Sequence, residues 1–228
     1  MRLAALVSGG KDSLYAMYLA SKEHEIKYIV SIISENPESY MFHFPNVKLV
    51  EKQAEVMNIP IIQKLTKGEK EGELEDLKET LNEIKDKIDG IVAGAIESNY
   101  QKGRLERICS GLDLQLITPL WHKDSEKLLR DMISRFDIII TAVSAPPLDE
   151  SWLGREIDEE CISELMELTK KYRIHLVGEG GEFETFVLDC PLFKKKLQII
   201  ETRKEWDSKT RSGILNIEKI EIAEKTIP

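Results

Sequence analysis

Cysteine is scarce in this sequence. Cys109, Cys161 and Cys190 are odd in number, widely spaced and without a CxxC pair in a chain of 228 residues. Disulfide-stapled secreted domains and cysteine-rich zinc sites both need cysteines in close, paired spacings. The sequence therefore indicates neither class, and we expect the three thiols to be buried or inert.

Long apolar runs and an excess of positive charge are also missing. No segment approaches the roughly 20 apolar residues of a membrane-spanning helix, and the first residues form no signal-peptide pattern. Lys and Arg number 32 against 41 Asp and Glu, a formal net charge of -9. Sequence-independent binding of nucleic acid comes largely from neutralised phosphates. We therefore expect a cytoplasmic protein with no membrane contact and no extensive nucleic-acid binding.

The chain begins with an apolar run, two glycines and a lysine. Residues 3–7 predict a buried strand and residues 13–20 a helix, so residues 8–12 form the turn between them. Helix N-termini present backbone N–H groups and partial positive charge, and glycine lets phosphate oxygens approach the backbone. The residues that we expect to bind nucleotide phosphates here are Ser8, Gly9, Gly10, Lys11, Asp12 and Ser13.

This turn differs from two common nucleotide motifs. A Walker loop needs Ser or Thr directly after the lysine and an earlier glycine, whereas Asp12 follows Lys11 and no glycine precedes Gly9. The dinucleotide pattern G-x-G-x-x-G is also absent. The order SGGKDS after a first strand instead resembles the PP-loop of the N-type ATP pyrophosphatases, which split ATP between the α and β phosphates. A plain connecting turn with a solvated lysine is the alternative.

Strands and helices alternate along the first half. The pattern predicts strands at 28–33, 59–63 and 91–95, a helix over 47–57 capped by Asn46, and a helix over about 72–87 with one apolar stripe. Such alternation predicts a Rossmann-like doubly wound parallel α/β sheet, which binds ligands at the carboxyl ends of its strands. Ser98 and Gln101 form an S-x-x-Q capping box for a helix ending near Gly111, so this second turn should face the same edge as SGGKDS.

The pattern changes in the second half. It predicts helices over about 125–135 and up to Tyr172, and strands at 137–143, 197–201 and 217–222 with polar turns between them. We place a soft boundary near Thr118. The expected organisation is an ATP-binding domain, residues 1–118, and a second, smaller α+β domain for the substrate, residues 119–228.

A second unusual segment, residues 178–185, reads GEGGEFET. It holds three acids and three glycines in eight positions. Such a density of like charge is unfavourable unless cations or hydrogen-bond donors meet it. We expect something positive to bind there, although an exposed acidic hairpin turn is the alternative.

These segments resemble one family across nearly the whole chain. SGGKDS, ESNYQKGR at 97–104, PLW at 119–121, GEGGEFET and LDCPLF at 188–193 are similar to the diphthine–ammonia ligases, or diphthamide synthetases. Members are PP-loop/HUP-type ATP pyrophosphatases that use ATP and ammonium to amidate the carboxylate of diphthine, a modified histidine on translation elongation factor 2. The resemblance implies an acyl adenylate and the products diphthamide, AMP and pyrophosphate. The short chain resembles the archaeal form, without the C-terminal extensions of eukaryotic relatives.

The chemistry of that reaction suggests roles for the residues. Lys11 and the backbone N–H groups of the turn would stabilise charge on the leaving pyrophosphate. Asp12 is the candidate Mg²⁺ ligand, or else an acid that only favours the helix dipole. Amidation needs a base and a negative pocket because ammonium is mostly protonated near neutral pH. The expected substrate-binding residues are Glu97, Ser98, Tyr100, Gln101, Arg104, Glu179, Gly180, Gly181, Glu182 and Glu184, with Lys11, Glu182 and Glu184 as the catalytic candidates. One or more of the acids could instead bind Mg²⁺ or pair with Arg104.

The acceptor implied by the resemblance also carries a trimethylammonium group, which aromatic faces and acids bind. We expect at least one of four aromatic residues to line a pocket for it with Glu182 or Glu184, first Tyr100 or Trp152, then Trp121 or Phe183. Each could instead belong to the core. Among the histidines, His43 in the polar loop near the ATP edge is the one to test.

Two other functions stay open. A tRNA-modifying PP-loop enzyme, of the thiolase or lysidine-synthase type, would share SGGKDS but should present a basic surface. A non-catalytic ATP-binding module of the universal-stress type would share the sheet but leave GEGGEFET unexplained. The sequence leaves open the oligomeric state, a homodimer included, and the route by which ammonia arrives.

Overall fold

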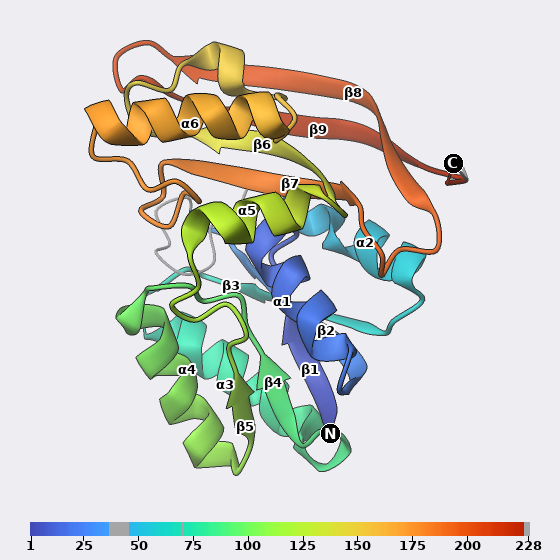
Figure 1. Ribbon diagram of the computed structural model, residues 1–228. Helices are drawn as coiled ribbons and strands as arrows, with labels where there is room; N and C mark the ends of the chain where they lie inside the picture. Colours follow the sequence, from blue (N-terminus) through green and yellow to red (C-terminus); the bar gives the residue numbers. More distant parts are fainter. Residues whose placement is uncertain (37–45, 70, 226–228) are drawn as a thin grey trace. The chain divides into compact units, whose positions relative to one another are not determined.

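The structure is a computed structural model that describes residues 1–36, 46–69 and 71–225 (Figure 1). It divides into two compact units, Met1–His122 and Lys123–Pro228, called unit 1 and unit 2 below. His43 lies outside the described residues. The assignment of residues 1–118 to ATP and 119–228 to the substrate stays a prediction.

Unit 1 is built on a five-stranded parallel sheet in the order β3-β2-β1-β4-β5. Its strands are β1 (Arg2–Leu6), β2 (Glu25–Ser34), β3 (Ile61–Thr66), β4 (Gly90–Val92) and β5 (Gln115–Ile117). Because every pair is parallel, the carboxyl ends of all five strands lie at one edge. The expected Rossmann-like doubly wound sheet is confirmed.

The helices of unit 1 are α1 (Lys11–Ser21), η1 (Val47–Leu49), α2 (Val50–Met57), α3 (Gly72–Ile84), η2 (Lys85–Lys87) and α4 (Asn99–Leu112). Helices α3 and α4 pack against the sheet through one apolar cluster that includes Leu77, Leu81, Leu105 and Ile91. Leu77 and Leu81 are fully buried, which is worth about 1.5–3 kcal/mol for each side chain. The apolar stripe expected along residues 72–87 is confirmed on α3.

Two local predictions for unit 1 are corrected. Asn46 does not cap the helix after it, because its backbone is left-handed, with φ of 64°, and its side chain makes no capping hydrogen bond. A side-chain cap needs extended backbone at that position. The strand expected at 91–95 ends at Val92, because Gly94 leaves the sheet to pack against α1. Ser98 caps α4 as predicted, since its hydroxyl accepts from Gln101 N at 3.3 Å.

Unit 2 is a four-stranded antiparallel sheet in the order β7-β6-β9-β8, with α5 and α6 side by side over it (Figure 1). Its elements are α5 (Ser125–Ile133), β6 (Asp137–Val143), η3 (Glu150–Trp152), α6 (Glu159–Lys171), β7 (Phe183–Asp189), β8 (Lys196–Asp207) and β9 (Ser212–Ala223). The prediction that the second unit has a smaller α+β fold is therefore confirmed.

Strands β8 and β9 are much longer than the sequence predicted. Each has 12 residues, whereas the alternating pattern indicated only 197–201 and 217–222. The missed part of β8 is rich in charged, exposed residues such as Arg203 and Glu205, whereas the missed start of β9 reads SGILN and shows no alternation. Arg203 forms ion pairs with Glu205 and with Glu218 of β9, so charge contributes to this hairpin beside backbone pairing and the buried side chains of Leu215 and Ile217. Hydrophobic periodicity cannot detect such a strand.

One buried hydroxyl in unit 2 predicts a stabilising substitution. Thr141 on β6 is fully buried, and its Oγ1 has no hydrogen-bond partner within the described residues. A buried polar group without a partner costs about 1–3 kcal/mol. We expect Thr141→Val to raise the free energy of unfolding by about 1 kcal/mol, measured by calorimetry. Thr80→Val is the control, because the Thr80 hydroxyl donates to Asp76 O at 2.7 Å; an equal gain in both variants would contradict the explanation.

Within the ranges that the structure describes, none of the helices combines the length and the apolarity that crossing a bilayer requires.

Candidate functional site

Strand β1 marks the switch point of the unit 1 sheet. It lies between β2 and β4, so the chain leaves β1 toward one side of the sheet and returns to β4 on the other. The loops that follow β1 and β4 therefore diverge, and ligands of such sheets bind in the resulting crevice. SGGKDS follows β1, and the turn that leads to Ser98 follows β4.

The backbone of the SGGKDS turn suits an anion. Gly9 has φ of 91°, a conformation that side chains other than hydrogen disfavour. Gly10 is the N-cap of α1 and provides no side-chain cap. Gln53, a buried residue of α2, donates through Nε2 to Gly9 O at 3.0 Å and so connects the turn to α2. The first N–H groups of α1 are thus presented by a rigid turn without a capping side chain.

Ser8 and Ser13 close this turn on itself. Ser8 N donates to Ser13 Oγ at 3.3 Å, and Ser13 Oγ donates to Gly10 O at 3.1 Å. Gly10 N donates to Ser8 Oγ at 3.4 Å. Both hydroxyls therefore shape the turn, and their expected contact with phosphate stays a prediction.

Lys11 and Asp12 form an ion pair at the start of α1. Lys11 Nζ lies 2.8 Å from Asp12 Oδ2, with 3% of the lysine side chain and 29% of the aspartate side chain exposed. Asp12 alone is compatible with Mg²⁺, which is usually held by one or two carboxylates together with substrate phosphates. No group of three or more His, Cys, Asp or Glu side chains in the described part of the chain could hold a metal by itself.

Gly94 joins the second turn to the first. A Cβ on Gly94 would lie 2.6 Å from Asp12 C and 2.7 Å from Ser13 N. The loop after β4 therefore packs directly on the backbone of the first turn of α1. The structure brings SGGKDS and the turn after β4 together, as the strand-end argument predicted.

Helix α4 places Tyr100 and Arg104 one turn apart. The Arg104 guanidinium carbon lies 4.2 Å from the Tyr100 ring centroid, and Nη2 pairs with Glu71 Oε1 at 2.9 Å. The suggested pairing of Arg104 with Glu97 or with an acid of GEGGEFET stays a prediction. Nothing in the charged run before α3 distinguishes Glu71, so sequence reasoning missed it. Glu97 is exposed, while Ser98 and Gln101 are partly buried at the helix start.

In unit 2, Glu182 holds the GEGGEFET loop together. Its Oε1 accepts from His175 N at 2.6 Å and its Oε2 from Gly180 N at 2.9 Å, and the residue is 8% exposed. Gly178 and Gly181, with φ of 76° and 79°, supply the left-handed turns. Two backbone N–H groups thus stabilise the negative charge of the Glu182 carboxylate. Its expected catalytic role stays a prediction.

The other two acids of the loop are more accessible. Glu179 and Glu184 are partly exposed, and Glu184 lies on β7 opposite Ala142 of β6. Ser144, directly after β6, donates through its backbone N to Glu182 O at 2.9 Å and through its hydroxyl to Gly181 O. The loops that flank β6 and β7 are therefore bound to each other.

The two hydrogen bonds to Glu182 predict a large effect of an isosteric change. Glu182→Gln replaces one acceptor oxygen by an NH₂ group that faces a backbone N–H, so one buried donor loses its partner. We expect a loss of about 1–3 kcal/mol in the free energy of unfolding of unit 2, measured with urea. Glu201→Gln, at an exposed position in β8, is the control. Equal stability of the two variants would refute this role of the carboxylate.

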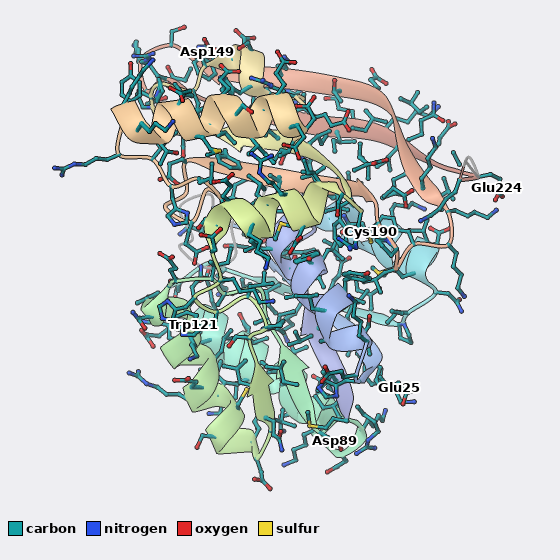
Figure 2. All side chains as sticks on the ribbon, in the orientation of Figure 1. Glu25, Asp89, Trp121, Asp149, Cys190 and Glu224 are labelled. Atoms are coloured by element: carbon teal, nitrogen blue, oxygen red, sulfur yellow. The ribbon has the colours of Figure 1, made fainter. Side chains whose placement is uncertain are left out.

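The four aromatic candidates differ in accessibility. Trp152 is 4% and Phe183 2% exposed, and the Arg155 guanidinium lies 4.6 Å from the Trp152 ring centroid. Both rings belong to the core of unit 2, so Trp152 as a first choice for a ligand pocket is wrong. Tyr100 and Trp121 are only partly buried; Trp121 lies beside α4 (Figure 2).

The cysteines are all free and buried, as expected. Burial raises the pKa of the Cys109 and Cys161 thiols to about 11, and that of Cys190 (Figure 2) to about 12. Because the thiolate is the nucleophile, thiols with these pKa values are unreactive near neutral pH. None of the three is a candidate nucleophile.

Comparison with known proteins covers both units. Residues 1–116 match the family model described as the diphthamide synthase N-terminal domain, and residues 124–222 match the diphthamide synthase C-terminal domain. A mouse protein named diphthine–ammonia ligase is 41% identical over 222 residues, covering 87% of this chain and 83% of the relative. The human protein of the same name is 40% identical, covering 86% and 82%. The zebrafish protein is 36% identical, covering 99% and 98%.

These matches extend over the elements that carry the candidate site residues. The first family model contains the SGGKDS turn and helix α4, and the second contains the GEGGEFET loop. The relatives are similar over most of both chains rather than over one unit. The chain therefore belongs to the diphthine–ammonia ligase, or diphthamide synthase, family.

Proposed function

We propose that this protein catalyses the ATP-dependent amidation of diphthine by ammonium, with diphthamide, AMP and pyrophosphate as products. The observation that carries the proposal is the SGGKDS turn at the sheet's switch point, where α1 begins without a side-chain cap and with a buried lysine. That arrangement suits the phosphates of a nucleoside triphosphate. The acceptor is inferred from relatives named diphthine–ammonia ligase.

The first step activates the acceptor. A carboxylate resists ammonia because its leaving group would be oxide, so a carboxylate oxygen attacks the α-phosphorus of ATP and the bond to the β-phosphate breaks. Lys11 and the N–H groups at the start of α1 stabilise the charge that develops on pyrophosphate. Lys11, whose Nζ lies 2.8 Å from Asp12 Oδ2, would bring its positive charge to the phosphates from the start of α1. Mg²⁺, held by Asp12 and the phosphates, would supply further charge neutralisation.

The second step forms the amide. Ammonia attacks the acyl carbon of the adenylate, and AMP leaves with the bonding electrons. A carboxylate is needed to bind ammonium and to accept its proton. We propose that this group is one of Glu97, Glu179, Glu182 and Glu184. Glu179 and Glu184 are preferred within unit 2 because Glu182 already accepts two backbone hydrogen bonds.

The proposal also names the protein that carries diphthine and the compartment in which the reaction takes place. We propose translation elongation factor 2 as the carrier of diphthine and the cytoplasm as the compartment. The two rival functions are not favoured, because both units match diphthamide synthase domains and the relatives share one name. The net charge of -9 also disfavours a tRNA substrate.

The test is a reconstituted reaction. Pure protein, ATP, Mg²⁺, ammonium and elongation factor 2 carrying diphthine should give AMP and an acceptor whose mass has fallen by about one unit, as expected when OH is replaced by NH₂. Omission of ammonium should prevent the mass change. Unmodified tRNA replaces the protein acceptor in the control. AMP formation with tRNA and none with the diphthine-bearing factor would reject the proposal.

A further inference from the structure

A cation of the chain rests on the Trp121 ring. Lys102 Nζ lies 4.3 Å from the ring centroid of Trp121 and 3.6 Å from Glu106 Oε1. One point in space therefore has an aromatic face on one side and a carboxylate on another. These are the two groups that bind an organic cation, and a cation within about 6 Å of a tryptophan centroid is attracted by the ring.

This position lies at the ligand-binding edge of unit 1. Trp121 follows β5, and Trp121 N donates to Thr118 O at 3.1 Å while His122 N donates to Ile96 O at 2.9 Å. The second bond attaches the Trp121 turn to the loop after β4, which contains Gly94. The His122 ring lies edge-on to the indole, with 4.6 Å between the two ring centroids. Trp121 is thus a fixed platform beside α4 (Figure 2).

The cation on Trp121 is also the exchangeable one. Lys102 has 27% of its side chain exposed and ends in a flexible, strongly hydrated ammonium that loses little on returning to water. Arg104 on Tyr100 has only 13% of its side chain exposed and is held by Glu71. Arg155 on Trp152 covers a ring that is 4% exposed. Among these three pairs, only Lys102 and Trp121 leave a ring that a ligand could take over.

We propose that Trp121 and Glu106 bind the quaternary ammonium group of the acceptor, and that Lys102 fills this site when no acceptor is bound. The inference rests on the proposed function, because diphthine carries a trimethylammonium group. Such a group donates no hydrogen bond and is held by aromatic faces and acids, whereas a primary ammonium gains more from water. The site would therefore make Trp121 a specificity residue that distinguishes the methylated acceptor from its unmethylated precursor.

The kinetic test compares opposite substitutions. Trp121→Leu should raise KM for the methylated acceptor about tenfold, with little change for the unmethylated precursor and for ATP. Lys102→Met removes the competitor and should lower KM for the methylated acceptor about two- to fivefold. Lys22→Met is the matched control, because Lys22 Nζ lies 4.5 Å from the Tyr18 ring centroid at the far end of α1. It should change neither constant.

A binding test separates this inference from the proposed function. In the full chain, tetramethylammonium chloride should shift the Trp121 indole N–H signal in NMR spectra, assigned with Trp121→Phe, and should shift it at lower concentration in Lys102→Met. This readout needs no turnover, so it stands even if wild-type protein amidates nothing. An equal shift with ammonium chloride, an equal KM rise for both acceptors in Trp121→Leu, or a KM rise in Lys102→Met would each overturn the proposal.

Discussion

We expect Lys11→Met to lower the rate of AMP formation by a factor of about 10² to 10³, the usual effect of removing one group that stabilises developing charge. Methionine keeps most of the lysine stem, so the core around this residue, which is 2% exposed, stays filled. The loss is therefore electrostatic. It should appear in kcat, measured as AMP release at saturating ATP, because the charge on pyrophosphate develops in the transition state.

Two comparisons make this prediction specific. Lys52→Met removes an exposed lysine of α2 that pairs with Glu55 at 2.8 Å, and it should leave the rate unchanged. Thermal unfolding should show that Lys11→Met remains folded. A soluble, folded Lys11→Met protein with nearly wild-type turnover would mean that the SGGKDS turn does not act on the leaving group.

The second large effect is expected from Gly94→Ala. The new Cβ would lie 2.6 to 2.8 Å from backbone atoms of Asp12 and Ser13, and backbone atoms of a helix start cannot move as a flexible side chain can. The first turn of α1 must shift away from the loop after β4. We expect at least about a tenfold fall in kcat/KM for ATP and a loss of about 1–3 kcal/mol in stability, the usual range for overpacking.

Gly111→Ala is the matched control for that substitution. Gly111 lies in α4, and a Cβ there meets nothing within 4 Å. Alanine is a better helix former than glycine by about 1 kcal/mol, so this variant should be as stable as the wild type or more stable, with full activity. If Gly94→Ala binds and uses ATP as the wild type does, the two loops are not coupled through this contact.

The local features of the candidate site could be predicted from the sequence. Residues 8–13 lie in a strand–turn–helix unit because apolar periodicity and glycine fix the conformation of neighbouring residues. The Ser98 cap of α4 is also local, because its hydroxyl accepts from the N–H of Gln101, three residues further on. The parallel sheet follows from the alternation of strands and helices. The turn and the cap depend on residues close in the chain, and the sheet was inferred from the order of elements along it.

The tertiary structure decided the rest, because it depends on residues far apart in sequence. Glu71 approaches Arg104, and Gly94 packs on Asp12 and Ser13, only after the sheet has brought α3, α4 and α1 to one edge. Trp152 and Trp121 are both tryptophans whose rings could bind a cation, yet Trp152 is buried and Trp121 is partly exposed. Apolar periodicity and glycine placement in the sequence determined the fold class and the strand–turn–helix unit at residues 3–20, and its motifs carried the resemblance to the family. Burial and long-range contacts, which no local pattern encodes, decided which of its charged and aromatic side chains hold the fold and which can meet a ligand.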